Sequence, residues 1–344
     1  GSPDDPASVV GRQLGYWREQ LAGLPDVVEI PTDRPRPPRA SGRGAQVGFT
    51  IPAATAARID EVSAQAGVTP FMVVHTALAV LLARLSSTSD IAIGTPVGGR
   101  GQTGLDPLIG MFVNTLILRT GVEPGASFEQ ILVQAKSVDL DAFANADIPF
   151  DEVVEACNVV RSDAFAPFTQ VWLTFEQTAL PELAGSDLAV GDVAGLRIES
   201  LAAGEVPARI DLLVAVSRNE DSRDKAADWT GSIIYATDLF DESTVESFTG
   251  NLLRILDAGL GDPGETVGSI TINEGPSVAE LAKVARARAT EQPVVSKDIA
   301  DSDAAVISGP GTAPVLLGQM FADVAAKSGK RPAVIDATGT TLTY

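Results

Sequence analysis

The chain has 344 residues, 45% of them hydrophobic and 20% charged, with 45 acidic side chains against 25 basic ones. A formal net charge of −20 argues against a nucleic-acid partner, because such a surface repels phosphate. The single cysteine excludes an internal disulfide and favours a reducing, cytoplasmic compartment. The sequence shows neither a signal peptide nor an apolar run of membrane-spanning length, which predicts a protein without membrane contact.

The N-terminal part of the chain predicts one helix and one extended connector. Apolar residues recur at helical spacing over residues 9–24, and Gly23 and Pro25 end the helix. Residues 30–44 are rich in proline and arginine, which excludes a helix or a central strand. We interpret this segment as a solvated connector rather than an anion site.

A buried helix containing the only histidine is predicted next. A strand at residues 46–51 and an amphipathic helix at 52–66, closed by Gly67, precede it. Thr69 and Pro70 start the following helix, residues 71–85, which is apolar nearly all round and therefore predicted to be buried. His75 lies inside it, so we expect a packed core residue rather than a catalytic base.

The stretch Ile109–Thr120 is the most informative part of the sequence. Both of its faces are mainly apolar, which predicts a central strand covered on both sides. Gly110 lets another backbone or a ligand approach closely. Asn114 and Thr115 are polar within this strand, and a buried carboxamide requires hydrogen-bond partners. Two alternatives remain open for Asn114: a structural bond to a neighbouring turn, or a place in the wall of a cavity that takes polar substrate.

The other elements of the chain follow the same patterns. Ser127 is expected to cap a helix through residue 142, and Asp147 is expected to cap a helix at 150–157 or to lie beside a channel. Asp241 is the expected N-cap of a helix ending at residue 258. Further strands are predicted at residues 90–97, 170–175, 196–201, 210–216, 231–237 and 267–272. The turn Gly98–Gly101 has neither P-loop nor dinucleotide-binding spacing.

Several of these segments together resemble the core motifs of condensation domains in nonribosomal peptide synthetases. Residues 109–115, with Arg119 beyond them, are similar to the fifth motif, I/V-G-x-F-V-N-T. Residues 145–151 resemble the sixth motif, H/N-Q-D-x-P-F-E, and residues 93–100 resemble an I-G-x-P-V-x-G-R passage. The seventh motif, R-D-x-S-R-N-P-L, is poorly kept, since Phe165 and Ala166 replace its inner Arg and Asn.

The resemblance implies an α/β fold like one lobe of chloramphenicol acetyltransferase, a mixed sheet with helices packed on it. It implies that residues 1–8 are a leader and that 9–272 form the C-terminal lobe of a condensation domain. Residues 273–313, rich in Ala, Ser, Gly and Pro, are predicted to be a linker with a helical patch near 278–289. Residues 314–344 resemble the truncated start of an adenylation domain, F-x-x-x-A…P-x-A-V…L-T-Y.

The resemblance also implies a function. Condensation domains form a peptide bond between acyl or peptidyl and aminoacyl thioesters, both carried on the phosphopantetheine arms of carrier domains. Their catalytic H-H-x-x-x-D-G element is not present in this sequence, so the catalytic histidine is expected upstream and the chain is predicted to be inactive alone. No cofactor or metal is expected to bind directly. The expected partners are the missing N-terminal lobe, peptidyl carrier domains and a downstream adenylation domain. The residues expected to line the substrate channel are Asn114, Thr115, Gly110, Pro96, Arg100 and Asp147.

Two other functions remain open. One is a condensation-like module without chemistry that recruits a carrier or partner protein, and the altered seventh motif favours it. The other is an epimerising or cyclising relative, which fits less well because the fifth motif has its condensing form. An intact H-H-x-x-x-D-G upstream would favour the enzyme. In every case we expect an apolar patch beside residues 109–120, where the N-terminal lobe would pack.

Overall fold

The computed structural model describes residues 5–99, 104, 107–178, 191–193, 196–198, 206–219, 227–272, 332–335 and 341–343. The chain divides into two compact units, Gly1–Asn273 and Glu274–Tyr344. In the second unit, β10 (Pro332–Ile335) pairs antiparallel with β11 (Thr341–Thr343). Arg100, the linker proposed for 273–313 and its helical patch lie outside the described residues.

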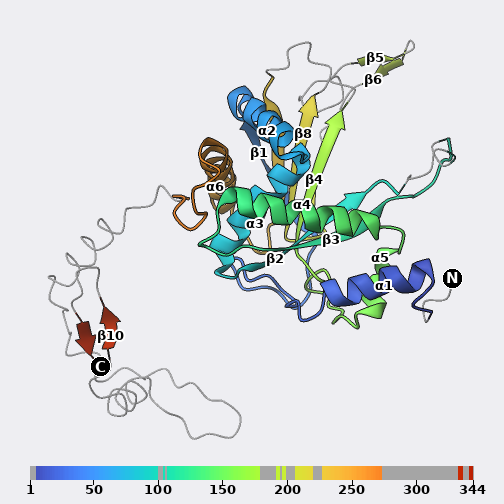
Figure 1. The fold of residues 1–344 in the computed structure, drawn as a ribbon, viewed down its shortest axis with the longest axis horizontal. Coiled ribbons are helices and arrows are strands. Elements are labelled where there is room, and N and C mark those ends of the chain that lie inside the picture. Colours follow the sequence, from blue (N-terminus) through green and yellow to red (C-terminus); the bar gives the residue numbers. More distant parts are fainter. Residues whose placement is uncertain are drawn as a thin grey trace, which may run out of the picture. The chain divides into compact units, whose positions relative to one another are not determined.

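A seven-stranded mixed sheet forms the first unit, in the order β3-β2-β4-β8-β9-β1-β7 (Figure 1). The pairs β2–β4 and β4–β8 are parallel and the others are antiparallel, which confirms the predicted fold class. The strands are β1 (Arg43–Ile51), β2 (Asp90–Val97), β3 (Asn114–Gly121), β4 (Val171–Thr178), β7 (Val206–Pro207), β8 (Leu212–Asn219) and β9 (Trp229–Ala236). A separate pair joins β5 (Gly191–Val193) to β6 (Leu196–Ile198), so the strand predicted at 196–201 is seen in part.

Helices cover the sheet on two faces and enclose two apolar cores. Alternation along β2 separates them, because Ile91 and Ile93 belong to the larger core whereas Ala92 belongs to the smaller one. The helices are α1 (Val9–Gln20), α2 (Ala53–Ala66), α3 (Pro70–Ser86), α4 (Phe128–Ala144), α5 (Phe150–Ala156) and α6 (Glu242–Gly261). The larger core lies under α2, α3, α4 and α6, and the smaller one joins β2 and β3 to α1 and α5.

The predicted helix ends are confirmed where local chemistry sets them. Thr69 Oγ1 accepts from the backbone N–H of Met72 at 3.3 Å, and Ser127 caps α4 in the same way. Gly67 ends α2 in the left-handed conformation, at φ 60°. As predicted, α3 is buried on all sides over residues 72–83.

The position of the predicted strand Ile109–Thr120 was wrong in two respects. The strand begins at Asn114, and β3 lies at the edge of the sheet rather than in its centre. Its partner β2 ends at Val97, opposite Asn114, so the residues before Asn114 have no ladder partner. Both faces of β3 are covered nevertheless, by α4 on one side and by α1 and α5 on the other, which explains why its sequence has the pattern of a central strand.

Carboxamide side chains occupy the outer backbone groups of this edge strand. Asn114 Oδ1 accepts from the N–H of Thr115 at 2.9 Å, and Gln20 Nε2 donates to the carbonyl of Arg119 at 3.5 Å. The amide of Gln134 pairs with both the N–H and the carbonyl of Gly121, at 3.1 and 3.0 Å. These bonds occupy part of the edge that another chain could otherwise pair with.

Residues 31–43, which we call the strap, are mostly exposed, as predicted for a solvated connector, and side-chain bonds also tie them to the rest of the unit. Asp33 accepts from the N–H of Asp241 at 2.7 Å and from Thr244 Oγ1 at 2.9 Å. Asp241 is the N-cap residue of α6, as predicted, but its side chain makes no capping bond, and Asp33 instead accepts from the N–H of Asp241 itself. The strap arginines pair with carboxylates, in the pairs Arg34–Asp241, Arg36–Asp211 and Arg43–Asp238.

The strand predicted at residues 267–272 was also wrong, because these residues form no strand. Arg84 Nη1 donates to three carbonyls of this segment, those of Val267, Gly268 and Ile270. Val267, Ile270 and Ile272 are buried without any strand partner. A single guanidinium thus satisfies carbonyls that a sheet would otherwise pair.

No single helix in the described part of the chain has both the length and the hydropathy of a membrane span. The helices α2 and α3, bent by 107° at their junction, pass such a test only when counted together and only by length and composition.

Candidate functional site

A cavity of about 830 Å³ opens where β2 ends and β3 begins. The turn between α4 and α5 forms its opposite wall. Its lining residues are Val97, Gly98, Gly99, Met111, Phe112, Val113, Asn114, Phe143, Ala146, Asp147 and Pro149. The cavity therefore gathers segments from the β2–β3 loop and from the sixth-motif region, which the sequence analysis linked to substrate.

Asn114 holds this turn through its carboxamide. Nδ2 donates to the carbonyls of Ala146 and Ile148 at 2.9 and 2.7 Å. Oδ1 accepts from the N–H of Phe150 at 3.0 Å, in addition to its bond to Thr115. All four bonds go to backbone, and the residue also lines the cavity, so both alternatives left open by the sequence apply to the same side chain.

The hydrogen bond from the N–H of Phe150 to Asn114 Oδ1 stabilises the first turn of α5. The N-cap position of α5 is Pro149, which offers no side-chain bond, and Asn114 Oδ1 supplies the missing acceptor from a distant strand. The prediction that Asp147 caps this helix was wrong. Asp147 is two residues too early, and its carboxylate is engaged elsewhere.

Two side chains of α1 hold the turn that contains Asp147. Gln13, only 7% exposed, donates from Nε2 to Asp147 Oδ2 at 2.9 Å. One turn further along α1, Trp17 Nε1 donates to the carbonyl of Asn145 at 2.9 Å. The sixth-motif turn is therefore fixed on one side by β3 and on the other by α1.

Of the remaining predicted residues, Arg100 lies outside the described part of the chain, and Pro96, Thr115 and Gly110 are next to lining residues in the sequence without lining the cavity. Pro96 and Thr115 face each other in the β2–β3 register. At Gly110 the nearest atoms to an added Cβ would be those of the Phe112 ring, at 3.2 Å. The group that approaches this glycine closely is therefore a side chain two residues further along the chain. At Gly99 (φ 58°) a Cβ would lie 1.9 Å from the carbonyl oxygen of Phe112, and only glycine fits.

The sequence analysis missed two residues of this region, Gln13 and Phe143. Gln13 is a polar residue next to the apolar stripe of α1, a position that signals a buried hydrogen bond. Phe143 lies in the last turn of α4 with 47% of its surface exposed, on the cavity wall. Exposed apolar side chains gather in the same loop, with Ile109, Met111 and Val113 at 105%, 88% and 58%.

His75 lies away from this cavity, as its helical pattern predicted. Its side chain has no exposed surface and does not line the cavity. Nδ1 lies 2.9 Å from Oδ1 of Asp139, which is equally buried, although no aligned hydrogen bond forms between them. We therefore describe the contact as a buried ionisable pair between α3 and α4, without access to a substrate.

Other ionisable groups near this region have shifted pKa values. Burial, with Asp141 and Asp139 nearby, raises the pKa of Tyr16 to about 12. Hydrogen bonds to Asp90, at 2.7 and 2.8 Å, raise the pKa of Arg119, which also donates to the carbonyls of Gln20 and Ala22. The arginine of the fifth motif thus joins β3, β2 and the end of α1.

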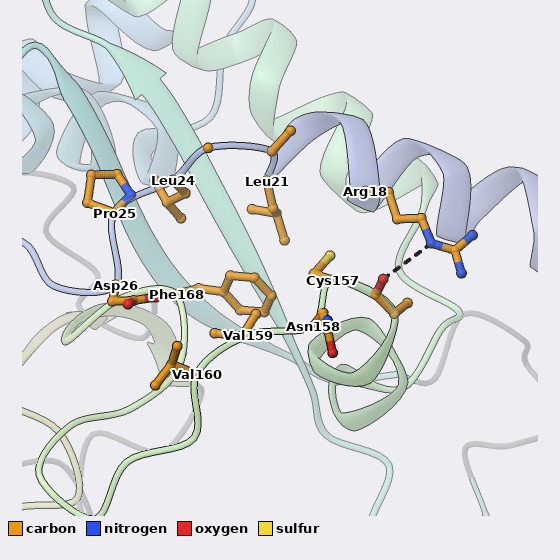
Figure 2. A pocket seen from close by; sticks show the side chains of 13 residues that line it. Arg18, Leu21, Leu24, Pro25, Asp26, Cys157, Asn158, Val159, Val160 and Phe168 are labelled. Carbon is orange, nitrogen blue, oxygen red and sulfur yellow. Dashed lines mark hydrogen bonds between the residues drawn. The ribbon is translucent and has the colours of Figure 1, made fainter.

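A second cavity, of about 380 Å³, lies between the C-terminal ends of α1 and α5 (Figure 2). It contains none of the predicted site residues. Arg18 Nε donates to the carbonyl of Ala156 at 3.3 Å at its edge, and burial raises the pKa of the Cys157 thiol. A raised thiol pKa keeps Cys157 protonated and unreactive at neutral pH. No group of three or more potential metal ligands occurs among the described residues.

Comparisons with known proteins identify the family of the chain. Residues 8–281 match the family described as "Condensation domain". The probable non-canonical nonribosomal peptide synthetase CymA of Salinispora arenicola is 40% identical over 272 residues, which are 79% of this chain and 3% of that protein. The isonitrile lipopeptide synthase of Mycobacterium tuberculosis is 32% identical over 334 residues, 97% of this chain and 12% of that protein.

A solved structure has a similar fold. The X-domain from teicoplanin biosynthesis, in complex with OxyB, is 27% identical with a TM-score of 0.70, over 78% of this chain and 57% of that one. The chain spans only a small part of the synthetases that it matches. The matched family covers most of the chain, and the chain belongs to the condensation-domain family of nonribosomal peptide synthetases.

Proposed function

We propose that the cavity beside Asn114 is one wall of the substrate channel of a condensation domain, which forms a peptide bond between two carrier-bound thioesters. The observation that carries this proposal is the turn of residues 145–150, which Asn114 fixes through three backbone bonds while it lines the cavity. Fixed walls serve such a reaction because both thioesters must be held within reach of each other.

The walls suit a phosphopantetheine arm. The arm is a narrow, flexible chain with amide groups, and the cavity is mainly apolar with polar groups at Asn114 and Asp147. We propose the arm as the carrier of both substrates, with no further cofactor, and carrier domains as partners. Asn114 and Asp147 line the channel in this proposal, whereas Pro96, Thr115 and Gly110 support its wall and Arg100 stays a prediction.

The catalytic base is proposed to come from a second lobe that bears the H-H-x-x-x-D-G element. General base catalysis requires hydrogen-bond reach to the proton that moves. The one imidazole of this chain, His75, is sealed between α3 and α4 and does not reach the cavity. We further propose that residues 273–313 link to an adenylation domain beginning near residue 314, and that the reaction takes place in the cytoplasm. The similarity to the isonitrile lipopeptide synthase, which extends over 97% of the chain, supports this order.

The test is peptide-bond formation from loaded donor and acceptor carrier domains. We expect no turnover by the 344-residue chain and turnover by a version extended through the upstream lobe, unchanged by His75→Ala provided that the variant folds. Turnover by the chain alone that is lost in His75→Ala would contradict the proposal, because His75 would then be catalytic.

A second function, recruitment of a partner protein without chemistry, has one observation in its favour. The X-domain structure to which this chain is similar was solved in complex with OxyB, and here Phe165 and Ala166 replace two polar positions of the seventh motif. The same assay separates the two functions. An extended version with an intact H-H-x-x-x-D-G that binds loaded carriers but forms no peptide bond would favour recruitment.

A further inference from the structure

The cavity contains a single charged group among the described residues. Of its two large polar side chains, Asn114 has committed its carboxamide to four backbone bonds and has little left for a ligand. The other is Asp147, and the remaining lining residues are apolar or glycine. Within the part of the chain that the structure describes, the charged recognition that this cavity offers therefore depends on one carboxylate.

This carboxylate is held in place and is only partly used. Gln13 donates to Oδ2 at 2.9 Å, and within the described residues Asp147 has no other side-chain hydrogen bond and no ion pair. Gln13 itself is nearly buried, and its Oε1 is buried without a partner, so the amide is committed to the donor role toward Asp147. A carboxylate has room for about four hydrogen bonds, which leaves most of its capacity free.

We propose that Asp147 is a binding residue for an N–H group on an apolar or amphipathic chain, and that Gln13 is its positioning residue. The inference rests on the proposed function of the cavity and names the chemistry that the cavity recognises. A carboxylate accepts hydrogen bonds but donates none, so it selects amines and amide N–H groups and disfavours anions.

Two parts of a carrier-bound substrate present such a group. One is the α-ammonium of an aminoacyl thioester, for which the carboxylate adds charge attraction to the hydrogen bond. The other is an amide N–H of the phosphopantetheine arm, which is neutral. Two probes separate them: L-alanyl-aminopantetheine, in which an amide replaces the thioester, and its N-acetyl derivative, which lacks the ammonium.

The experiment measures dissociation constants of both probes by NMR titration of the 344-residue chain. Asp147→Asn keeps the size of the side chain and removes its charge. Asp151→Asn is the matched control, since Asp151 is exposed on α5 and lies outside the cavity lining. We expect Asp147→Asn to weaken binding of the alanyl probe about fivefold or more, and Asp151→Asn to leave it unchanged. Asp147→Glu should keep part of the affinity.

Gln13→Leu tests the positioning role through the ratio of the two dissociation constants, which a general loss of stability does not change. We expect the preference for the alanyl probe to shrink in this variant. A Gln13→Leu variant that melts earlier but keeps the preference would overturn the role of Gln13.

The other outcomes are equally distinct. Equal weakening of both probes by Asp147→Asn supports the proposal and assigns the N–H to the arm. Unchanged binding of both probes by Asp147→Asn overturns the acidic site and leaves the cavity assignment standing. Failure of both probes to bind the wild-type chain overturns both the inference and the proposed place of the cavity in the channel, whereas binding of the alanyl probe alone supports recognition of the ammonium.

Discussion

At the scale of single residues, Asn114 ties a strand, a turn and a helix together. Its two donors face the carbonyls of Ala146 and Ile148, and its oxygen faces the N–H groups of Thr115 and Phe150. No other side chain offers two donors and an acceptor in this geometry, apart from the longer glutamine. The arrangement predicts that even an isosteric change is poorly tolerated.

We predict that Asn114→Asp destabilises the chain at neutral pH by about 2–4 kcal/mol, because an ionised oxygen then faces two carbonyl oxygens. That repulsion raises the pKa of the new carboxyl in the folded state. The variant therefore regains stability as the pH falls through this raised pKa, where the protonated form donates again. Urea unfolding at about pH 7 and about pH 5 measures both effects.

The control is Asn145→Asp, since Asn145 makes a single exposed bond, from Nδ2 to the carbonyl of Asp141 at 2.8 Å. It should cost less than about 1 kcal/mol. Equal losses in the two variants, or a loss in Asn114→Asp that does not depend on pH, would contradict the assigned role of Asn114.

The sequence predicted the importance of Asn114 but not its partners. A carboxamide inside an apolar strand signals a specific bond, and the alternatives of turn and cavity could both be stated in advance. The partners lie 32 to 36 residues away, and only the tertiary fold brings them together. The same limit explains the wrong assignment of a capping role to Asp147, because a local pattern cannot show a cap that comes from a distant strand.

At the scale of elements, the buried pair His75–Asp139 joins α3 to α4. Both side chains are fully buried and lack aligned hydrogen bonds, so each depends on the other for compensation. Removing one partner leaves an uncompensated buried ionisable group, whereas removing both is often neutral or stabilising.

We predict that Asp139→Leu destabilises the chain by about 3–5 kcal/mol, and that adding His75→Phe restores most of the loss. The free energy of unfolding in urea, measured for the two single variants and the double variant, gives the coupling. Losses that simply add would show that the two side chains act independently and would contradict the pair.

The strap connects the N-terminal segment to α6 through carboxylates whose pKa values are lowered. The N–H of Asp241 and then the hydroxyl of Thr244 lower the pKa of Asp33 below its usual 3.8, and the backbone and side chain of Ser41 lower that of Asp238. A carboxylate with a lowered pKa stabilises the folded state above its unfolded pKa. This contribution is lost as the pH falls through the folded pKa.

We predict that Asp33→Asn destabilises the chain above about pH 5, and that the difference from the wild type disappears as the pH falls below about 3.8. Urea unfolding between about pH 3 and pH 6 measures it. Asp26→Asn, a change at an exposed carboxylate with no side-chain bond among the described residues, should show no such trend. A difference for Asp33→Asn that persists in acid would mean that the carboxylate charge is not what holds α6.

Most elements could be predicted because residues close in sequence determine where they begin and end. Thr69, Gly67 and Ser127 start or end their helices through neighbours within four residues. The two wrong strands had a different cause. Apolar alternation shows that a segment is covered by other residues, but it does not identify the element that covers it. The edge strand β3 and the irregular segment 267–272 therefore both have the sequence pattern of a strand inside a sheet.

At the scale of the whole molecule, the loop before β3 carries the two most exposed large apolar side chains of the described residues, Ile109 and Met111. Ile109, Met111 and Val113 are exposed, and Met111 and Val113 share the cavity wall with Phe143. Large apolar side chains gathered at a cavity mouth are typical of an interaction surface rather than of ordinary surface. The expected apolar patch beside residues 109–120 is therefore present.

We predict that this patch lets the chain self-associate, but weakly. Three fully buried side chains contribute about 4–9 kcal/mol, and association costs about 4–15 kcal/mol, so the dissociation constant should be about 0.1 mM or weaker. Sedimentation equilibrium from about 10 µM to about 1 mM should show a mass that rises with concentration.

The double change Ile109→Ser and Met111→Ser should abolish the rise without changing the free energy of unfolding, because neither side chain is buried in the monomer. The matched control is Val9→Ser with Val160→Ser, two exposed residues (54% and 56%) outside the patch, which should leave the association intact. Association lost in the control but kept in the patch variant would place the contact elsewhere, and a strictly monomeric wild type would show that the patch does not bind itself.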